Sequence, residues 1–445
     1  MAGYAELLVI EGAAGTGKTA TLAAARHELA AWGNELVVVT PTLKAAHVAA
    51  HQTGGRAFSA AWLAHQYGFR WDENGAWSRV PHSPHQDARL DYDDVLLIDE
   101  AGMLDQDTAL ALITIADETG ANLTMVGDRH QLPAVGRGGV LDLAARWAHP
   151  EALLTLDSVH RFTDPKYAAL SLLMRTGERR GEVFDTLLGT GRIAIHASEV
   201  ECQQALATEW LTEGDPPLLV ANTREQVAAL NALVHDLLVD AGRVDDTTSL
   251  TTRAGQRMGI GDQVATREND RGLGVANRDT WIIESLTEDG GATVTGVRGR
   301  RSLPRDYVQL HLELAYATTA HGAQGDTVAS AHLLVGDDTG AAAAYVGMTR
   351  GRQRNVAHLV ADSTDNARRQ WIDVFNRDRA DLGPTHAAAT ALDDIDRYGP
   401  ASRAEVTLQR AALQRALQPA SSPRSGSTTP YQTSNSREVG SSVSR

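Results

Sequence analysis

The stretch from residue 12 to residue 19 reads Gly12-Ala13-Ala14-Gly15-Thr16-Gly17-Lys18-Thr19. An apolar run, residues 6–11, precedes it, and an alanine-rich segment with helical spacing, residues 20–31, follows it. The spacing GxxxxGK[ST] between a strand and a helix predicts a loop whose backbone amides turn inward around phosphate oxygens. The N-terminus of the following helix adds partial positive charge. This stretch therefore predicts a strand, a phosphate-binding loop and a helix, in that order.

Three further apolar runs each end in a polar or glycine-containing turn. They cover residues 36–39, 95–98 and 123–126. Short aliphatic runs of this kind are typical of strands that are buried on both faces of a parallel sheet. Ligands of such sheets lie at the carboxyl ends of the strands. The sequence therefore predicts an α/β fold in which the phosphate-binding loop lies at that edge.

Two acidic residues, Asp99 and Glu100, end the third of these runs. Lys18 is expected to reach the β- and γ-phosphates of a nucleotide, and the Thr19 hydroxyl to bind Mg²⁺. Asp99 is the expected partner of the Mg²⁺ shell, and Glu100 is the candidate base for an attacking water. Paired acids at a strand end are otherwise common as solvated turn residues. Beside this loop we expect ATP and Mg²⁺ as cofactors, with the nucleotide contacted by Gly12, Ala13, Ala14, Gly15, Thr16, Gly17, Lys18 and Thr19.

Composition excludes several classes of protein. A chain of 445 residues is too long for one ordinary core, so two to four lobes are expected. The formal charge of -15 excludes a polybasic protein, and 42% hydrophobic residues exclude wholesale disorder. The single cysteine excludes a disulfide framework and a multi-cysteine metal site. Because no apolar run approaches about 18 residues and the N-terminus lacks signal-peptide features, we expect a soluble, cytoplasmic protein without a membrane partner.

Two segments interrupt the alternation of strands and helices. Asn74-Gly75 is a strong hairpin signal, and a short hairpin would place Trp71 opposite Trp77. From residue 249 to about residue 310 the segments shorten to strand length and glycines multiply, which indicates a small β-barrel-like insertion. Four arginines in it, at 298, 300, 301 and 305, are equally consistent with a phosphate-backbone track and with a solvated loop.

Seven segments occur in an order that resembles the superfamily one DNA helicases. They read EGAAGTGKT, VVVTPTLKAA, LLIDEAGM, MVGDRHQLPAVGRGG, VHRF, YATTAHGAQGDTV and YVGMTRGR. The chain is most similar to the RecD-like branch, which includes the helicase half of conjugative relaxases of the TraI/TrwC (MobF) type. The resemblance covers roughly residues 6–360. It implies two RecA-like lobes of the P-loop NTPase class and ATP-dependent movement on single-stranded DNA, with 5′ to 3′ polarity.

The resemblance also implies roles for individual residues. Gln131 becomes a γ-phosphate sensor, and Arg161 and Arg350 become groups that approach the γ-phosphate from the second lobe. With Glu100 these form the expected catalytic set. The residues expected to line the single-strand channel are Thr42, Lys44, Thr319, His321 and Gln324, where hydroxyls and amides suit phosphate contacts that do not read bases.

The expected division of the chain follows from the resemblance and the composition together. The first RecA-like lobe is 1–155, with a hairpin insertion near 66–90, and the second is 156–248 with 311–380. An SH3-like β insertion is expected at 249–310, a helical extension at 381–418 and a disordered tail at 419–445. Expected partners are single-stranded DNA or DNA junctions, and a separate relaxase or other conjugation or recombination proteins.

The sequence departs from the family pattern in three places. The upstream segment whose glutamine reads the adenine edge is not found in the residues before Gly12, so adenine selectivity is in question. The relaxase half is not found either, so strand nicking is not expected. The turn that reads NGD in the family reads Asn277-Arg278-Asp279 here, and a non-glycine residue there costs backbone freedom where φ is positive.

Two other functions fit parts of the sequence. A non-catalytic DNA-binding remnant fits the missing upstream segment. A small-molecule P-loop kinase fits the phosphate-binding loop and the Asp99-Glu100 pair, but the arginines of a second lobe speak against it, since such kinases close a short lid instead.

Overall fold

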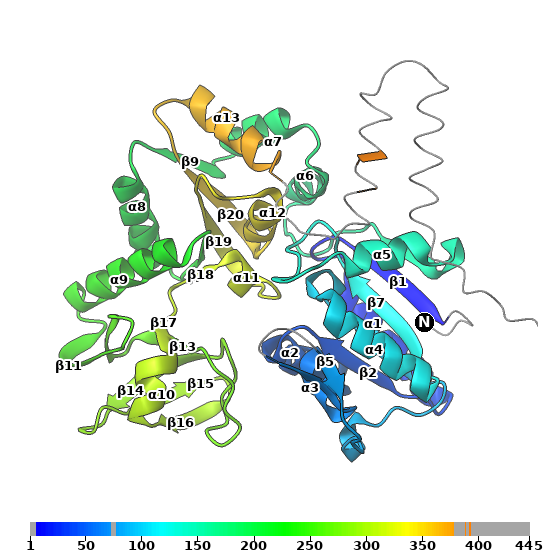
Figure 1. Cartoon of the computed structure of the whole chain (residues 1–445). Helices are drawn as coiled ribbons and strands as arrows, with labels where there is room; N and C mark the ends of the chain where they lie inside the picture. The colour runs from blue at the N-terminus through cyan, green and yellow to red at the C-terminus, as the bar shows by residue number, and fades with distance from the viewer. Residues whose placement is uncertain (1–5, 73–76, 378–387, 389–390, 393–445) are drawn as a thin grey trace, which may run out of the picture. The chain divides into compact units, whose positions relative to one another are not determined.

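The computed structural model describes residues 6–72, 77–377, 388 and 391–392 (Figure 1). The elements from β1 to α13 all fall within one compact unit, Met1–His386. The predicted tail and nearly all of the predicted helical extension lie outside the described residues, as do Asn74 and Gly75. In the described part of the chain, no helix has both the length and the apolar content needed to span a bilayer.

The predicted phosphate-binding loop follows one strand of a six-stranded sheet. All the strands of this sheet are parallel. From edge to edge the strands are β3 (Arg56–Ser59), β2 (Leu36–Thr40), β6 (Val95–Ile98), β7 (Asn122–Gly127), β1 (Leu7–Gly12) and β8 (Leu153–Leu156). The four predicted strands are confirmed, and they form the centre of this first parallel sheet. The edge strands β3 and β8 lack the continuous apolar run that revealed the others, because their side chains are only partly buried.

Helices cover both faces of the first parallel sheet. Helices α1 (Lys18–Ala31) and α2 (Leu43–Thr53) pack on one face through Leu22, Leu29 and Ala49. The other face is covered by α3 (Ala60–Gln66), α4 (Gln106–Thr119) and α5 (Val140–Trp147). The short 3₁₀ helices η1 (Gln86–Ala88), η2 (Ala101–Met103) and η3 (Pro150–Ala152) lie in the connections. This three-layer order leaves the carboxyl ends of the strands free for ligands.

A second sheet has five parallel strands. Its order is β18 (Ala317–Thr319), β10 (Leu218–Ala221), β19 (Val328–Val335), β20 (Gly351–Val360) and β9 (Ile193–His196). Helices α8 (Glu199–Thr212) and α9 (Arg224–Asp240) cover one face. The opposite face is covered by α6 (Pro165–Thr176), α7 (Arg180–Gly189), α11 (Ala320–Ala323), α12 (Ala341–Gly347) and α13 (Thr364–Val374).

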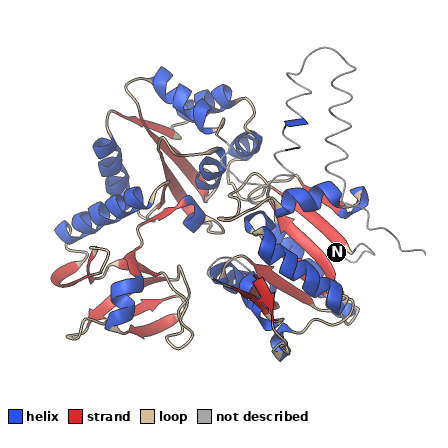
Figure 2. Cartoon of the chain, in the orientation of Figure 1, coloured by secondary structure: helices blue, strands red, loops and turns tan. Residues whose placement is uncertain are grey.

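The segment between α9 and β18 is built of antiparallel strands, which Figure 2 shows in red. Strands β11 (Asp245–Thr251) and β12 (Arg257–Ile260) pair with each other. A five-stranded sheet follows, in the order β16 (Gly299–Leu303), β15 (Ala292–Gly296), β14 (Thr280–Leu286), β13 (Gln263–Thr266) and β17 (Leu312–Leu314), with α10 (Arg305–His311) before β17. The strands extend a few residues beyond the predicted range 249–310, because the polar start of β11 and the last short strand carry no clear alternation.

Two local predictions can be compared directly with the backbone. The short strands β4 (Phe69–Trp71) and β5 (Trp77–Arg79) pair in antiparallel fashion with Trp71 opposite Trp77, as predicted. Arg278 has φ of 69°, so the Asn277-Arg278-Asp279 turn does hold a non-glycine residue in the left-handed region. Three of the insertion arginines are held by neighbours, since Arg298 pairs with Asp279, Arg300 pairs with Glu284, and Arg301 donates to the Gly274 carbonyl.

A buried histidine ties α9 to the antiparallel segment and predicts a pH effect. Nδ1 of His235 lies 2.9 Å from the carboxylate of Asp262, which also accepts hydrogen bonds from the Tyr316 hydroxyl and the Gly259 amide. The hydrogen bond to Asp262 raises the pKa of His235 above 6.5, and the charges of Asp246 and Asp236 add to this, against the opposing effect of burial. The pair therefore stabilises the fold fully below pH 6.5, and its contribution is lost as the pH rises through the folded-state pKa.

We expect the thermal unfolding midpoint of the wild type to fall more between pH 6 and pH 9 than that of His235→Asn, because only the wild type gives up this charged pair. Thermal melts of both proteins across this range measure the difference. Parallel curves would contradict the assignment.

Candidate functional site

The loop after β1 has the geometry that its sequence predicts. Gly15 and Gly17 have φ of 82° and 83°, in the left-handed region that favours glycine. A Cβ on Gly15 would lie 2.2 Å from Cβ of Arg161, so no side chain fits at this position. The Lys18 ammonium donates to the carbonyl oxygens of Gly12 and Ala13, at 2.8 and 3.2 Å. The loop therefore curls around its own lysine at the start of α1. The side chain of Thr19 lies outside the described part of the chain.

A cavity of about 440 Å³ lies beside this loop. Residues from the regions of both parallel sheets line this cavity. Some of these residues are more than 300 positions apart in the chain. The predicted residues among this lining are Ala14, Gly15, Thr16, Gly17, Lys18, Thr42, Lys44, Asp99, Glu100, Gln131, Arg161, Gln324 and Arg350. The fold thus brings nearly all the predicted nucleotide residues, and part of the predicted DNA set, to one place.

The two acidic residues of the cavity differ in environment. Burial and the neighbouring Glu100 carboxylate, against the opposing charge of Lys18, raise the pKa of Asp99 to about 6. Asp99 accepts from the Glu100 amide at 2.9 Å. Glu100 has φ of 55°, an uncommon conformation for a residue with a side chain, and such strain concentrates at functional sites. Its carboxylate lies 3.4 Å from the amide nitrogen of Gln324, which comes from the second sheet.

Two arginines, Arg350, which is buried, and Arg161, which is half-buried, bring positive charge to the cavity without a carboxylate partner. Arg350 is 2% exposed and donates only to neutral oxygens, those of Val346, Thr349 and Asp326. Arg161 donates to the Thr349 carbonyl at 2.7 Å. Within the described ranges, no carboxylate oxygen lies within 4.0 Å of either guanidinium. Burial, together with the nearby charge of Arg350, lowers the pKa of Arg161 to about 9. Uncompensated buried cations are costly, so the site favours an anionic ligand.

Residues that sequence reasoning did not single out connect the two sheets. The hydroxyl of Tyr345 accepts a hydrogen bond from the Ala14 amide and donates to the Asp128 carboxylate, at 3.0 and 3.2 Å. Arg175 donates to Asp128 and to Glu11 at 2.8 and 2.6 Å. Tyr345 lies in the quoted segment YVGMTRGR, so its position gave a signal. Arg175 gave none, because its partners are distant in sequence.

The predicted DNA residues do not all come together. Thr42 caps α2 by accepting from the Ala45 amide, and Lys44 forms an ion pair with Asp326 at 2.7 Å. Thr319 caps α11 by accepting from the Gly322 amide. His321 lines a different cavity, of about 670 Å³, with arginines that include Arg129, Arg175, Arg180 and Arg377. Gln131 also lines both cavities, and its side chain donates to Asp128.

Comparison with known proteins places this geometry in context. Residues 1–198 match a family model described as an AAA domain. The chain is 29% identical over 360 residues to a probable conjugal transfer protein TraA of Sinorhizobium fredii. This alignment covers 79% of the chain and 31% of the relative. It is 29% identical over 185 residues to the multifunctional conjugation protein TraI of Escherichia coli K12, which covers 38% of this chain and 10% of TraI. The chain therefore spans about a third of the length of the TraA relative.

Among solved structures, a crystal structure of Bacteroides Pif1 bound to single-stranded DNA aligns with a TM-score of 0.56. The alignment covers 88% of this chain and 94% of Pif1 at 16% identity, which shows a shared fold. The α/β fold, with its parallel-sheet RecA-like core, is thus the fold of Pif1. The resemblance that the seven segments indicated is confirmed: residues 1–198 match an AAA domain model, the relatives are the conjugation proteins TraA and TraI, and the solved structures with a similar fold are those of Pif1 helicases.

Proposed function

We infer that this protein is an ATP-dependent DNA helicase or translocase that moves 5′ to 3′ on single-stranded DNA and hydrolyses ATP between two RecA-like lobes. The observation that supports this most strongly is the cavity lined by Lys18 and Glu100 from one sheet region and by Arg350 from the other. A site built from two lobes couples its own chemistry to their relative movement. A small-molecule kinase has no need for this second set of arginines.

Each residue then has a distinct task. Lys18 leaves its carbonyl partners to bind the β- and γ-phosphates, while Asp99 and the Thr19 hydroxyl hold Mg²⁺. Glu100 accepts a proton from the attacking water, and Gln131 senses the γ-phosphate. Arg161 and Arg350 neutralise the negative charge that grows on the phosphoryl oxygens in the transition state. Mg²⁺ supplies charge neutralisation between the β- and γ-phosphates when it is bound.

We further propose that the lobes are 1–155 and 156–248 with 311–380, and that 249–310 is an SH3-like insertion. DNA would contact Thr42, Lys44, Thr319, His321 and Gln324, and Lys44 would exchange Asp326 for a phosphate. The hairpin of Trp71 and Trp77 would part the duplex, where each base-pair step costs about 1.4 kcal/mol. DNA junctions and a relaxase or other conjugation proteins are the proposed partners. The alternative is a non-catalytic or weakly active DNA-binding fragment of a larger relaxase-helicase, prompted by the upstream glutamine segment that the sequence does not show.

Replacing Glu100 separates these two functions. We expect Glu100→Gln to lower ATP turnover by about 10²–10⁴, because the amide cannot accept the proton of the attacking water. Binding of a fluorescent ATP analogue should persist, since the phosphate-binding loop is intact. Glu118→Gln, at an exposed carboxylate on α4, is the matched control. A wild type without ATP turnover would favour the non-catalytic alternative, whereas a Glu100→Gln variant as active as the wild type would refute the role of Glu100 as the base.

Unwinding of a tailed duplex tests the polarity. Duplexes with a single-stranded tail at either the 5′ or the 3′ end should be unwound only when the tail is 5′. Unwinding that depends on a 3′ tail would reverse the proposed direction.

A further inference from the structure

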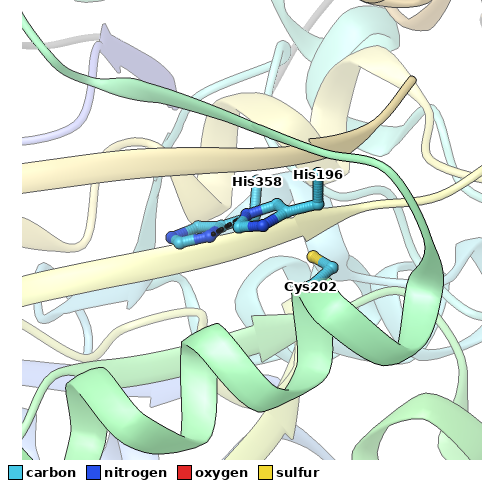
Figure 3. Close-up of side chains that lie close together, drawn as sticks. All are labelled: His196, Cys202 and His358. Atoms are coloured by element: carbon cyan, nitrogen blue, oxygen red, sulfur yellow. Dashed lines mark hydrogen bonds between the residues drawn. The ribbon is translucent and has the colours of Figure 1, made fainter. Parts of the chain in front are cut away.

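Three histidines form a diagonal across the second parallel sheet, under α8. His332 lies on β19, His358 on β20 and His196 on β9, which are neighbouring strands. The register pairs Leu334 with His358, and Val360 with His196, so each histidine is two residues further along than its neighbour. All three side chains therefore point to the face that α8 covers. Figure 3 shows the hydrogen-bonded rings of His196 and His358, with the Cys202 thiol from α8 beside them.

Three ligand atoms converge where this diagonal meets the C-terminal part of α8. Nδ1 of His332 lies 3.0 Å from Nε2 of His358, and Oε2 of Glu209 lies 2.6 Å from the first nitrogen and 3.6 Å from the second. A tetrahedral zinc ion with bonds of about 2.0–2.1 Å holds its ligand atoms about 3.3 Å apart. The three separations bracket this value, so the atoms lie at the corners of a face that a small cation can cap.

Hydrogen bonding alone leaves this cluster unsatisfied. Oε2 of Glu209 is buried and has no hydrogen-bond partner in the described part of the protein, although an imidazole nitrogen is 2.6 Å away. Nε2 of His332 is also buried without a partner. A buried carboxylate oxygen without a donor is expensive, whereas a cation at the shared point would satisfy it together with both imidazole nitrogens.

The outer nitrogens of both histidines face groups that suit a metal site. Histidine ligands usually give their second ring N–H to a carboxylate or another acceptor, which fixes the ring. Nδ1 of His358 lies 3.0 Å from Nε2 of His196, and Nε2 of His332 lies 3.7 Å from a carboxylate oxygen of Glu213. Both histidines are fully buried, while the side chains of Glu209 and Glu213 are 35% and 26% exposed, so the carboxylates open the cluster to solvent.

We propose that Glu209, His332 and His358 form a binding site for a divalent transition-metal ion of the zinc type. Two imidazoles and one carboxylate are the ligand types that zinc takes, and water would complete the tetrahedron. The ion would pin α8 to strands β19 and β20. None of the three residues lines the cavity beside Lys18, so the ion is separate from the proposed Mg²⁺ of the nucleotide site.

A second combination shares His358 but is less suitable. His196, Cys202 and His358 also place one ligand atom each within 4.8 Å of one another, and all three residues are buried. His358 would have to ligate through Nδ1, which gives up the His196 hydrogen bond that orients its ring. This set also offers no solvent-exposed ligand through which an ion could enter. The two sets differ in the thiolate, so they can be told apart by spectroscopy.

Metal binding by the untagged full chain tests the proposal. The protein is treated with EDTA, dialysed, and titrated with Co²⁺ while its visible absorption is followed, then with Zn²⁺ in competition. We expect one ion per chain with a tetrahedral Co²⁺ spectrum, and a higher thermal unfolding midpoint with Zn²⁺. Glu209→Gln should weaken binding by at least about 100-fold, because it removes a direct ligand and outer-shell losses alone cost 10–100-fold.

Three control variants locate the ion. Glu199→Gln, on the exposed face of the same helix, should bind like the wild type, and so should Asp99→Asn, which alters the nucleotide site. His332→Gln provides a second ligand variant, with its fold checked by circular dichroism. Binding well below one ion per chain, or a folded Glu209→Gln protein that binds as tightly as the wild type, would overturn the proposal. A thiolate-to-cobalt charge-transfer band that disappears in Cys202→Ser would overturn it in favour of the cysteine set.

Discussion

Arg350→Ala should lower the rate constant of ATP turnover by about 10³–10⁵, the range found for arginines that stabilise a phosphoryl-transfer transition state. The side chain is buried at the cavity and donates only to neutral oxygens. An anionic ligand would therefore be the partner that neutralises its charge. An interaction that grows in the transition state lowers kcat, while the KM for MgATP changes little. Steady-state kinetics over a range of MgATP concentrations separate these two effects.

Two further variants show whether the loss is chemical or structural. Arg350→Lys keeps the positive charge but loses the planar guanidinium with its paired N–H donors. It should therefore recover only part of the rate. Arg146→Ala removes an exposed arginine on α5 and should leave turnover unchanged. A folded Arg350→Ala protein with nearly normal kcat would refute the proposed role of Arg350 in the transition state.

Lys18→Ala should abolish measurable ATP turnover, with a loss of at least about 10²–10³, the range for removing a group that stabilises developing charge. The ammonium lies at the centre of the loop and bonds only to two carbonyl oxygens, which a triphosphate can replace as partners. Its loss removes the side-chain cation that lies within the phosphate-binding loop. Turnover and nucleotide affinity are measured together, since both should fall.

The chain supplies its own matched controls, because it contains only three lysines. Lys166→Ala, at an exposed position on α6, should behave as the wild type. Lys44→Ala tests a different role, and it should lower the affinity for single-stranded DNA. An active Lys18→Ala protein would refute the proposed phosphate site.

The sequence predicted the parts of the molecule that local chemistry determines. The four central strands carried continuous aliphatic runs, and the phosphate-binding loop required glycine where φ is positive. The edge strands β3 and β8 were missed because half-buried strands show no such run. The pairing of Trp71 with Trp77 followed from turn chemistry alone.

Long-range contacts were beyond reach of the same reasoning. The contact between Tyr345 and Ala14 joins residues 331 positions apart, and the diagonal of His332, His358 and His196 depends on strand register and on the neighbour order of the sheet. A lone histidine in an apolar strand is typical of a buried core residue. The sequence around each histidine therefore did not predict the cluster. Motif order, in contrast, singled out Arg161 and Arg350, which both line the cavity, although arginine is abundant in the chain; their approach to a γ-phosphate stays a prediction.

The most direct measurement is the ATP turnover of this chain with and without a single-stranded oligonucleotide. We expect the rate of ATP turnover to rise with oligonucleotide concentration and to reach a plateau. The oligonucleotide concentration needed for half of the full effect should increase with salt, because phosphate contacts dominate the affinity. Equal turnover in its presence and absence, or phosphate transfer to a small acceptor regardless of DNA, would contradict a motor whose two lobes share one nucleotide.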